Sequence, residues 1–312
     1  MRETDAIEVD AGRDAGSTGG IAVTVGHVEH AGVRLYVREV GAGRPLIVVH
    51  GGPDFDHRYL VPEIDGLANV CRVVAYDQRG RGRSRGPRAE DVTLASDIDD
   101  LDAVRRAVID GPVALLGHSW GGVLAMAYAA AFPERVSKLV LLGTGPATHH
   151  DWVSLRDDMA RHRSAEDRDA FRRIDTSAAY LDGETDADLA HYRVHFRIAV
   201  TDPDRHLPML LPRLREGWSA EDVRRARRIE ARLYEETTAS PSFDLRPGLS
   251  ALRAPTLVLH GSADFVPTRL VRPIHEAVRD SRMVVLDGCG HFSFMEQPAR
   301  AVPCVAGFLI GR

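Results

Sequence analysis

The residues most suited to chemistry lie in GHSWGG (117–122), which contains the pattern G-x-S-x-G. The apolar run VALLGHS (113–119) is typical of a buried strand, and the run 123–132 is typical of a buried helix. A serine at a sharp strand–helix turn projects its hydroxyl above the sheet edge, and flanking glycines leave the turn the room it needs. The context on both sides therefore predicts that Ser119 is a nucleophile.

A serine hydroxyl is a weak nucleophile at neutral pH, and it needs a base that is oriented by a carboxylate. When the serine lies on this kind of turn, the acid and then the histidine are expected just after later strands. Asp264 follows the strand-like run 256–260, and His291 follows the run 283–286. An aspartate after a strand is usually a turn residue, but both partners occur where they are expected. We therefore predict the catalytic set Ser119, Asp264 and His291.

The segment HGGP (50–53) ends another buried strand and predicts an oxyanion hole. Acyl transfer needs N–H donors aimed at the oxygen that becomes negative. Two consecutive glycines allow a backbone amide to face the site without a Cβ in the way. We expect the donors to be the amides of Gly52 and Trp120, with Gly51 as the neighbouring alternative.

Strand-like and helical patterns alternate around these motifs, which indicates the α/β class with a mainly parallel sheet. Residues 21–40 predict a β-hairpin at the start of this pattern. Between 146 and 250 the chain is charged, helical in period and without strand-like runs. We therefore expect three parts: a flexible tail over 1–20, a core over 21–145 plus 251–312, and an inserted helical cap over 146–250.

Composition excludes several function classes. The chain has 312 residues, of which 44% are hydrophobic, and a net charge of −5, so it can bury a core and lacks the basic excess of a nucleic-acid binder. The basic stretch RGRGRSRG (79–86) is interpreted as a loop. The three cysteines lie far apart, and neither metal-ligand spacing nor a phosphate-binding glycine motif is present. We expect no metal, no cofactor, no nucleic acid and no membrane partner, and a cytoplasmic location; the oligomeric state stays open.

Five motifs together resemble those of the α/β-hydrolase superfamily. They are HGGP (50–53), DQRGRGRS (77–84), GHSWGG (117–122), GSADFVP (261–267) and GCGHF (288–292). The set is similar more narrowly to the proline iminopeptidase group, whose members carry HGGPG, DQRGxGxS and GxSWGG. The resemblance covers about residues 22–145 and 251–312.

This resemblance implies an eight-stranded, mainly parallel sheet flanked by helices, with an inserted cap. It implies a serine hydrolase in which Ser119 attacks, His291 acts as general base and acid, and Asp264 orients the histidine. The implied reaction is release of an N-terminal proline, or a similar small residue, from a peptide or amide. In DQRG, Asp77 and Arg79 are interpreted as holding the loop by ion pairing.

Two departures from the group bear on specificity. Asp54 stands where the group usually has a glycine, which places a carboxylate at the rim of the oxyanion loop. The group recognises a free amine through acidic cap residues, for which the candidates are Glu230, Glu235 and Glu236; the same spacing is also typical of a solvated helix face. Asp54, Glu235 and Glu236 are thus the predicted substrate-binding residues.

Other activities remain open at this stage. The same triad serves esterases, lactonases, and acyl-transfer or carbon–carbon bond enzymes of secondary metabolism. A hydrolase-like scaffold that binds a ligand without turnover belongs to a different class. In each case the expected partner is a small molecule or a short peptide.

Overall fold

The computed structural model describes residues 7–9, 17–18, 21–86 and 88–311. Their strands form one sheet in the order β1-β3-β4-β6-β5-β7-β8-β9-β10, with β2 beside β3. The eight longer strands are β3 (Ile21–His30), β4 (Val33–Val40), β5 (Pro45–Val49), β6 (Arg72–Tyr76), β7 (Val113–His118), β8 (Val136–Leu142), β9 (Thr256–Gly261) and β10 (Ser281–Leu286). The predicted α/β class with an eight-stranded sheet is confirmed.

Strand direction follows the predicted pattern. Strands β3 and β4 form the antiparallel hairpin expected over 21–40, and β4 also pairs antiparallel with β6. The other pairs, from β6 through β5, β7, β8 and β9 to β10, are parallel. Because parallel strands end at the same sheet edge, the loops after β5, β7, β9 and β10 meet there.

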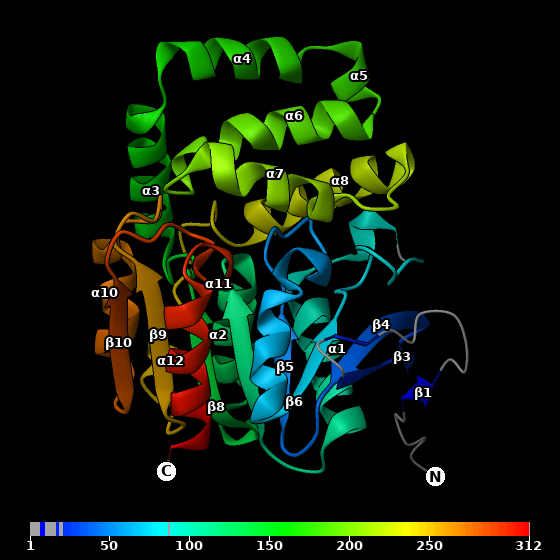
Figure 1. Ribbon diagram of the computed structural model, residues 1–312, viewed down its shortest axis with the longest axis vertical. Coiled ribbons are helices and arrows are strands. Elements are labelled where there is room, and N and C mark those ends of the chain that lie inside the picture. The colour runs from blue at the N-terminus through cyan, green and yellow to red at the C-terminus, as the bar shows by residue number, and fades with distance from the viewer. Residues whose placement is uncertain (1–6, 10–16, 19–20, 87, 312) are drawn as a thin grey trace.

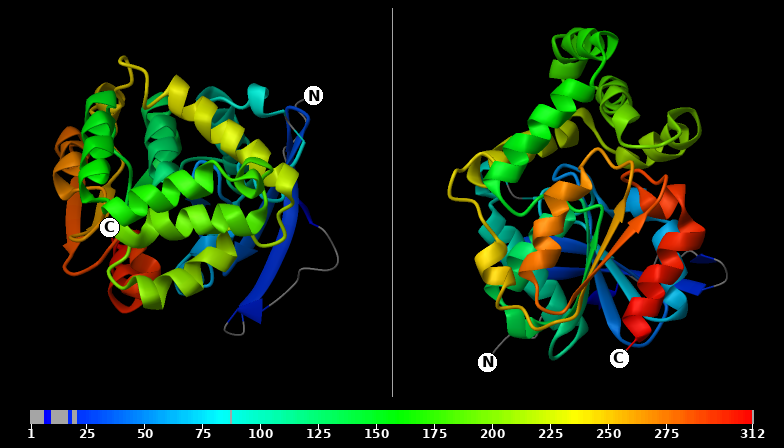
Figure 2. Two further views of the ribbon diagram at one scale, coloured as in Figure 1. Left: turned by 90° about the horizontal axis from the view of Figure 1, so that it is seen from above. Right: turned by 90° about the vertical axis from the view of Figure 1, so that its left-hand side faces the viewer.

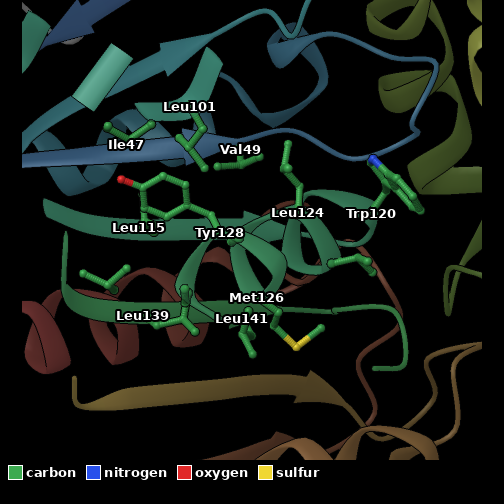
Figure 3. Packing of buried hydrophobic residues seen from close by; sticks show 14 of the residues in the cluster. Ile47, Val49, Leu101, Leu115, Trp120, Leu124, Met126, Tyr128, Leu139 and Leu141 are labelled. Carbon is green, nitrogen blue, oxygen red and sulfur yellow. The ribbon is translucent and has the colours of Figure 1, made fainter. Parts of the chain in front are cut away.

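Helices cover both faces of the sheet (Figures 1 and 2). The core helices are α1 (Leu94–Val108), α2 (Trp120–Ala131), α9 (Arg246–Leu249), α10 (Thr268–Ala277), α11 (Ser293–Glu296) and α12 (Pro298–Ile310), with short 3-10 turns η1 (His57–Leu60), η2 (Glu63–Asn69), η3 (Ala89–Asp91) and η4 (Pro133–Arg135). Successive strand residues point to opposite faces. Ile47 and Val49 accordingly pack in the cluster with α1 and α2, whereas Leu46 and Val48 pack in the cluster with α12. Figure 3 shows the first of these clusters.

Helix α9 falls within the 146–250 segment expected to form the cap, but it packs on the core beside α2. The other helices between β8 and β9 form a separate helical layer. Its elements are α3 (His149–His162), α4 (Ala165–Asp175), α5 (Ala178–Leu181), α6 (Thr185–His195), η5 (Phe196–Ile198), α7 (Pro203–Leu214) and α8 (Ala220–Glu236). Figure 1 shows them together above the carboxyl ends of the strands, and we call them the cap. Thr148 and Asp244 pair in an isolated antiparallel bridge, so the chain leaves and re-enters the core at one place.

The tail predicted over 1–20 lies largely outside the described residues. Where it is described, it departs from the prediction: β1 (Glu8–Val9) and β2 (Ser17–Thr18) pair antiparallel with β3. Neither pairing is visible as a periodic pattern, because each strand has only two residues. In the part of the chain that is described, every helix is too short or too polar to cross a bilayer.

The DQRGRGRS segment after β6 is tied to α1 by buried ion pairs. Arg79 Nε donates to Asp100 at 2.6 Å, and Arg81 Nη2 donates to Asp97 at 2.8 Å. Asp77 accepts a hydrogen bond from His57 Nδ1 at 2.7 Å. The structural interpretation of Asp77 and Arg79 is therefore confirmed, and the basic stretch is a loop whose buried guanidinium groups hold neighbouring segments.

Replacing Arg81 by methionine is expected to destabilise the fold by roughly 3–5 kcal/mol, because it leaves the buried Asp97 carboxylate without its cation. Urea unfolding of the variant and the wild type measures this difference. The matched control is Arg88→Met, since Arg88 forms an exposed ion pair with Asp91, and such a pair contributes little. Equal unfolding midpoints for wild type and Arg81→Met would contradict the prediction.

Candidate active site

Ser119 lies on a strained turn between β7 and α2. Its backbone angles are φ 56° and ψ −119°, a region that a residue with a Cβ rarely adopts. The adjacent glycines make the turn possible: a Cβ on Gly121 would lie 2.0 Å from the Val49 carbonyl oxygen, and one on Gly117 would lie 2.3 Å from the Gly121 oxygen. The predicted sharp strand–helix turn is confirmed, and the Ser119 side chain lines a cavity beneath the cap.

The predicted acid and base are paired. His291 Nδ1 lies 3.0 Å from each carboxylate oxygen of Asp264, and both residues are buried. Burial favours the neutral acid, but attraction to His291 and His260 and a hydrogen bond from the Val266 amide keep the pKa of Asp264 below its ordinary value. An ionised Asp264 holds the proton on His291 Nδ1, which leaves Nε2 as the basic nitrogen.

His118, the residue before Ser119, links Tyr59 to the backbone of His291 through hydrogen bonds. The Tyr59 hydroxyl lies 2.7 Å from His118 Nδ1, and His118 Nε2 lies 3.1 Å from the His291 carbonyl oxygen. Burial lowers the pKa of His118 to about 3, with His291 adding to the effect. His118 is therefore neutral near pH 7. It accepts from the Tyr59 hydroxyl at Nδ1 and donates from Nε2 to the His291 carbonyl oxygen.

The same tyrosine decides between the candidate oxyanion donors. The Gly51 amide donates to the Tyr59 hydroxyl at 2.8 Å, so it is already engaged, which favours Gly52 over Gly51 as the donor. Gly52 has φ 103°, and a Cβ there would lie 2.5 Å from the Asp54 nitrogen, so glycine is required. Trp120 is the first residue of α2, where an amide has no partner within the helix. Gly52 and Trp120 both line the cavity with Ser119, as an oxyanion hole requires.

The cavity of about 250 Å³ lies between the strand ends and the cap. Its core side includes the candidate catalytic side chains of Ser119 and His291. The cap contributes aromatic, apolar and charged groups: Trp152, Leu155, Arg156, Met159, Tyr180, His191, Tyr192, His195, Phe196, Arg227, Glu230, Tyr234 and Thr238. The site therefore combines a mostly apolar wall with a few polar groups, as small-ligand sites commonly do.

Among the acidic candidates on α8, the structure brings only Glu230 to the cavity. Glu230 is part-buried and hydrogen-bonded to Tyr234. Glu235 and Glu236 are exposed and absent from the cavity lining, and Glu236 accepts from the Leu94 amide at 3.2 Å. Helical geometry explains this correction, because they project about 140° and 120° away from Glu230 around the axis.

Asp54 is a buried residue of the cavity rather than an exposed rim carboxylate. Its Oδ2 accepts from the Tyr192 hydroxyl at 2.5 Å and from the Arg215 guanidinium. Its Oδ1 is buried and finds no hydrogen-bond partner among the described residues. One oxygen of this carboxylate is thus held by the cap, and the other is available within the cavity.

Sequence reasoning did not identify Tyr59, Tyr192 or Arg215. None of them belongs to a motif, and each acts on a residue far away in the sequence: Tyr192 and Arg215 lie 138 and 161 positions from Asp54. The available signal was the unusual Asp54 itself, because a buried carboxylate needs a cation. It does not say which of the many arginines supplies it.

One described group has the composition of a metal site. Asp56, His57 and Asp77 offer one ligand atom each, all within 4.8 Å of one another. These atoms already serve the fold: His57 Nδ1 bonds Asp77, and Asp56 accepts from the Arg58 amide at 2.9 Å and from Trp218 Nε1 at 2.9 Å. The cluster fastens η1 to neighbouring segments.

Comparison with known proteins agrees with this fold. Residues 44–298 match the family described as the alpha/beta hydrolase fold, which is most of the chain. The chain therefore belongs to the alpha/beta hydrolase family, and it is a hydrolase.

Among its relatives are enzymes named proline iminopeptidase. The one from Thermoplasma volcanium is 27% identical over 87% of this chain and 91% of its own length. The one from Saccharolobus solfataricus is 26% identical over 93% of each chain. The crystal structure of the proline iminopeptidase from Mycobacterium smegmatis aligns with a TM-score of 0.67 and 25% identity, covering 91% of this chain and 97% of that one. The proline iminopeptidase-like resemblance is confirmed.

Asp264→Asn is expected to lower the rate of Ser119 labelling by a fluorophosphonate by roughly 10³- to 10⁴-fold, because an amide no longer holds the proton on His291 Nδ1. The measurement is the second-order labelling rate, with Asp287→Asn, an exposed acid after β10, as the control. An unchanged rate in Asp264→Asn would place the orienting acid elsewhere.

Proposed function

We propose that the chain is a serine hydrolase that works through Ser119, His291 and Asp264. The observation that carries the proposal is the joint arrangement of the strained Ser119 turn and the His291–Asp264 pair around one covered cavity. Because the cap covers the cavity, bulk water has limited access to the reacting groups.

The proposed mechanism follows from these positions. His291 Nε2 removes the proton from the Ser119 hydroxyl, and the serine oxygen attacks the substrate carbonyl. The amides of Gly52 and Trp120 stabilise the resulting oxyanion. The protonated His291 then gives its proton to the leaving group, and an acyl-enzyme remains on Ser119. Water, activated by His291, releases the acyl group and regenerates the serine.

The proposed substrate is a short peptide or amide with a free amine on a small N-terminal residue such as proline. Two carboxyl groups support this specificity: Glu230 and the unpartnered Oδ1 of Asp54 both belong to the cavity that holds Ser119. A volume of about 250 Å³ is at the lower end for ligand cavities, which suits a small residue. The relatives named proline iminopeptidase support the same proposal.

A second candidate is hydrolysis of neutral esters or lactones. It is favoured by the pKa of Glu230 in the cavity, which burial and the neighbouring Asp54 raise well above its ordinary value. A protonated Glu230 attracts an amine less strongly than a carboxylate does. The two candidates therefore differ in whether activity depends on the substrate amine.

Ser119→Ala is expected to abolish fluorophosphonate labelling and to lower hydrolysis by at least about 10³-fold. The wild type and the variant should be assayed on prolyl and alanyl anilides, on the N-acetylated forms of the same compounds, and on an acetyl ester. Preference for the free amine supports the aminopeptidase, and turnover of esters alone supports the second candidate. The control Ser250→Ala, an exposed serine, should match the wild type. Retained activity in Ser119→Ala would overturn the proposed nucleophile.

Glu230→Gln is expected to remove a pH dependence that is specific to free-amine substrates. Burial and then Asp54 raise the pKa of Glu230, whereas Arg215 and the Tyr234 hydroxyl lower it, and Asp188 raises it further. Below this raised pKa the group is neutral and binds the ammonium weakly. The kcat/KM for the amine substrate should therefore increase as pH rises through it, until the amine itself loses its proton.

The measurement is the ratio of kcat/KM for a prolyl anilide to that for its N-acetylated form, taken across pH. This ratio cancels any pH dependence that the two substrates share. Glu235→Gln, an exposed acid on the same helix, is the matched control and should keep the wild-type profile. An unaltered profile in Glu230→Gln would assign amine recognition to other groups.

A further inference from the structure

We propose that Arg215 of the cap is a positioning residue for the oxyanion loop, residues 50–54, so that the oxyanion hole is complete only when the cap is seated on the core. This inference rests on the proposed hydrolase function. It concerns a side chain that is not itself part of the cavity lining but binds Asp54, which is.

The oxyanion loop is fixed through its backbone at four places. Three of the partners belong to the core and the fourth to the cap: Gln78 Nε2 donates to the His50 oxygen at 2.8 Å, the Gly51 amide donates to Tyr59 at 2.8 Å, Arg81 Nε donates to the Pro53 oxygen at 2.8 Å, and Arg215 Nη1 donates to the Asp54 oxygen at 2.9 Å. After Gly52, the core holds the loop at the Pro53 carbonyl through Arg81. The cap holds it one residue further on, at the Asp54 carbonyl, through Arg215.

The Arg215 guanidinium is fully enclosed, with 0% of its side chain exposed. Besides the Asp54 backbone it binds Asp54 Oδ2, and its Nε donates to Asp188 Oδ2 at 2.7 Å. Burial opposes the charge, but Asp54 and Asp188 raise the pKa of Arg215 above its ordinary value. A permanently charged group between two buried carboxylates has little freedom to move.

Aromatic rings and a second ion pair restrict this group further. The rings of Phe55, Tyr192 and Trp218 have centroids 5.2, 5.1 and 4.6 Å from the guanidinium carbon. On the far side of Asp188, Arg227 Nε donates to Oδ1 at 2.8 Å. The contacts therefore run from the oxyanion loop through Arg215 to Asp188 on α6 and Arg227 on α8.

Movement of Asp54 reaches the oxyanion donor because Gly52 and Asp54 are in close contact. A Cβ on Gly52 would lie 2.5 Å from both the Asp54 and the Phe55 nitrogens, so the turn is tightly folded at this point. A misplacement of about 1 Å in a catalytic group can cost roughly 100-fold in rate, and one oxyanion donor is worth about 10²- to 10³-fold. Loss of the Arg215 anchor is therefore expected to reduce kcat.

Lysine cannot reproduce this anchor. Arg215 binds four acceptors with a planar fork: the Asp54 carbonyl, the Asp54 carboxylate, the Asp188 carboxylate and the Leu214 carbonyl. An ammonium group keeps the charge but does not present donors in that fixed plane. Arg215→Lys therefore separates geometry from charge, and it avoids leaving the buried Asp54 carboxylate without a cation.

The test uses the full chain with the variants Arg215→Lys and Asp188→Asn, and with Arg213→Met as the matched control. Arg213 lies in the last turn of α7, which ends just before Arg215, and it also joins the cap to the core, through Glu63 at 2.8 Å, but it does not touch the oxyanion loop. Active sites are first counted by complete fluorophosphonate labelling of Ser119, so that rates refer to folded enzyme only. Melting temperature is recorded for every variant.

We expect Arg215→Lys to lower kcat per active site roughly 10- to 100-fold while KM changes less than about threefold. A trifluoromethyl ketone, which forms an oxyanion on Ser119, should bind correspondingly more weakly. Asp188→Asn should act in the same direction by a smaller factor, because Arg215 keeps its bonds to Asp54. Arg213→Met should leave kcat and ketone affinity unchanged whatever it does to the melting temperature.

Two failures are distinguishable. If the wild type shows no Ser119-dependent labelling or turnover, the proposed hydrolase function fails. If the wild type is active but Arg215→Lys and Asp188→Asn keep wild-type kcat and ketone affinity per active site, the positioning role fails, including when their melting temperatures fall. If Arg215→Lys does not fold, Asp188→Asn alone decides, and its wild-type kcat and ketone affinity would overturn the inference.

Discussion

The site depends on the close approach of the first turn of α2 to the end of β5. Gly121 lies so near the Val49 carbonyl that any side chain there would overlap it. The same approach brings the oxyanion loop to the nucleophile, since a Cβ on Gly51 would lie 3.0 Å from the Ser119 Cβ. Because the loop after β5 and the turn after β7 meet at this contact, the two glycine-rich motifs form one structure. The acid and the histidine then join it from the ends of β9 and β10.

Much of the fold and of the catalytic set could be predicted because both are encoded locally. Buried strands are visible as apolar runs, and Ser119, Asp264 and His291 follow the ends of such runs. Which of several candidate residues faces the cavity could not be predicted, because it depends on packing. The phase of α8 selects Glu230 over Glu235 and Glu236, and it depends on which face meets the core.

The remaining discrepancies have equally specific causes. A tyrosine eight residues later engages the Gly51 amide, and this leaves Gly52 as the candidate loop donor. The cation for Asp54 comes from residue 215, which only the seated cap brings near. Neither contact follows from a local pattern: the first depends on how the chain folds back at η1, and the second joins residues 161 positions apart. The short pairings of β1 and β2 with β3 are below the length at which alternation is detectable.

The bridge between Thr148 and Asp244 has a consequence for how this enzyme could diverge or be redesigned. Because the two ends of the cap adjoin, the whole segment between them is exchangeable as a unit without disturbing strand order, as inserted domains generally are. Asp54 limits that modularity. A cap recruited from another enzyme has to bring its own cation for this buried carboxylate, or the core has to restore a neutral residue at position 54. Recombination in this lineage is therefore expected to replace residue 54 and the cap together.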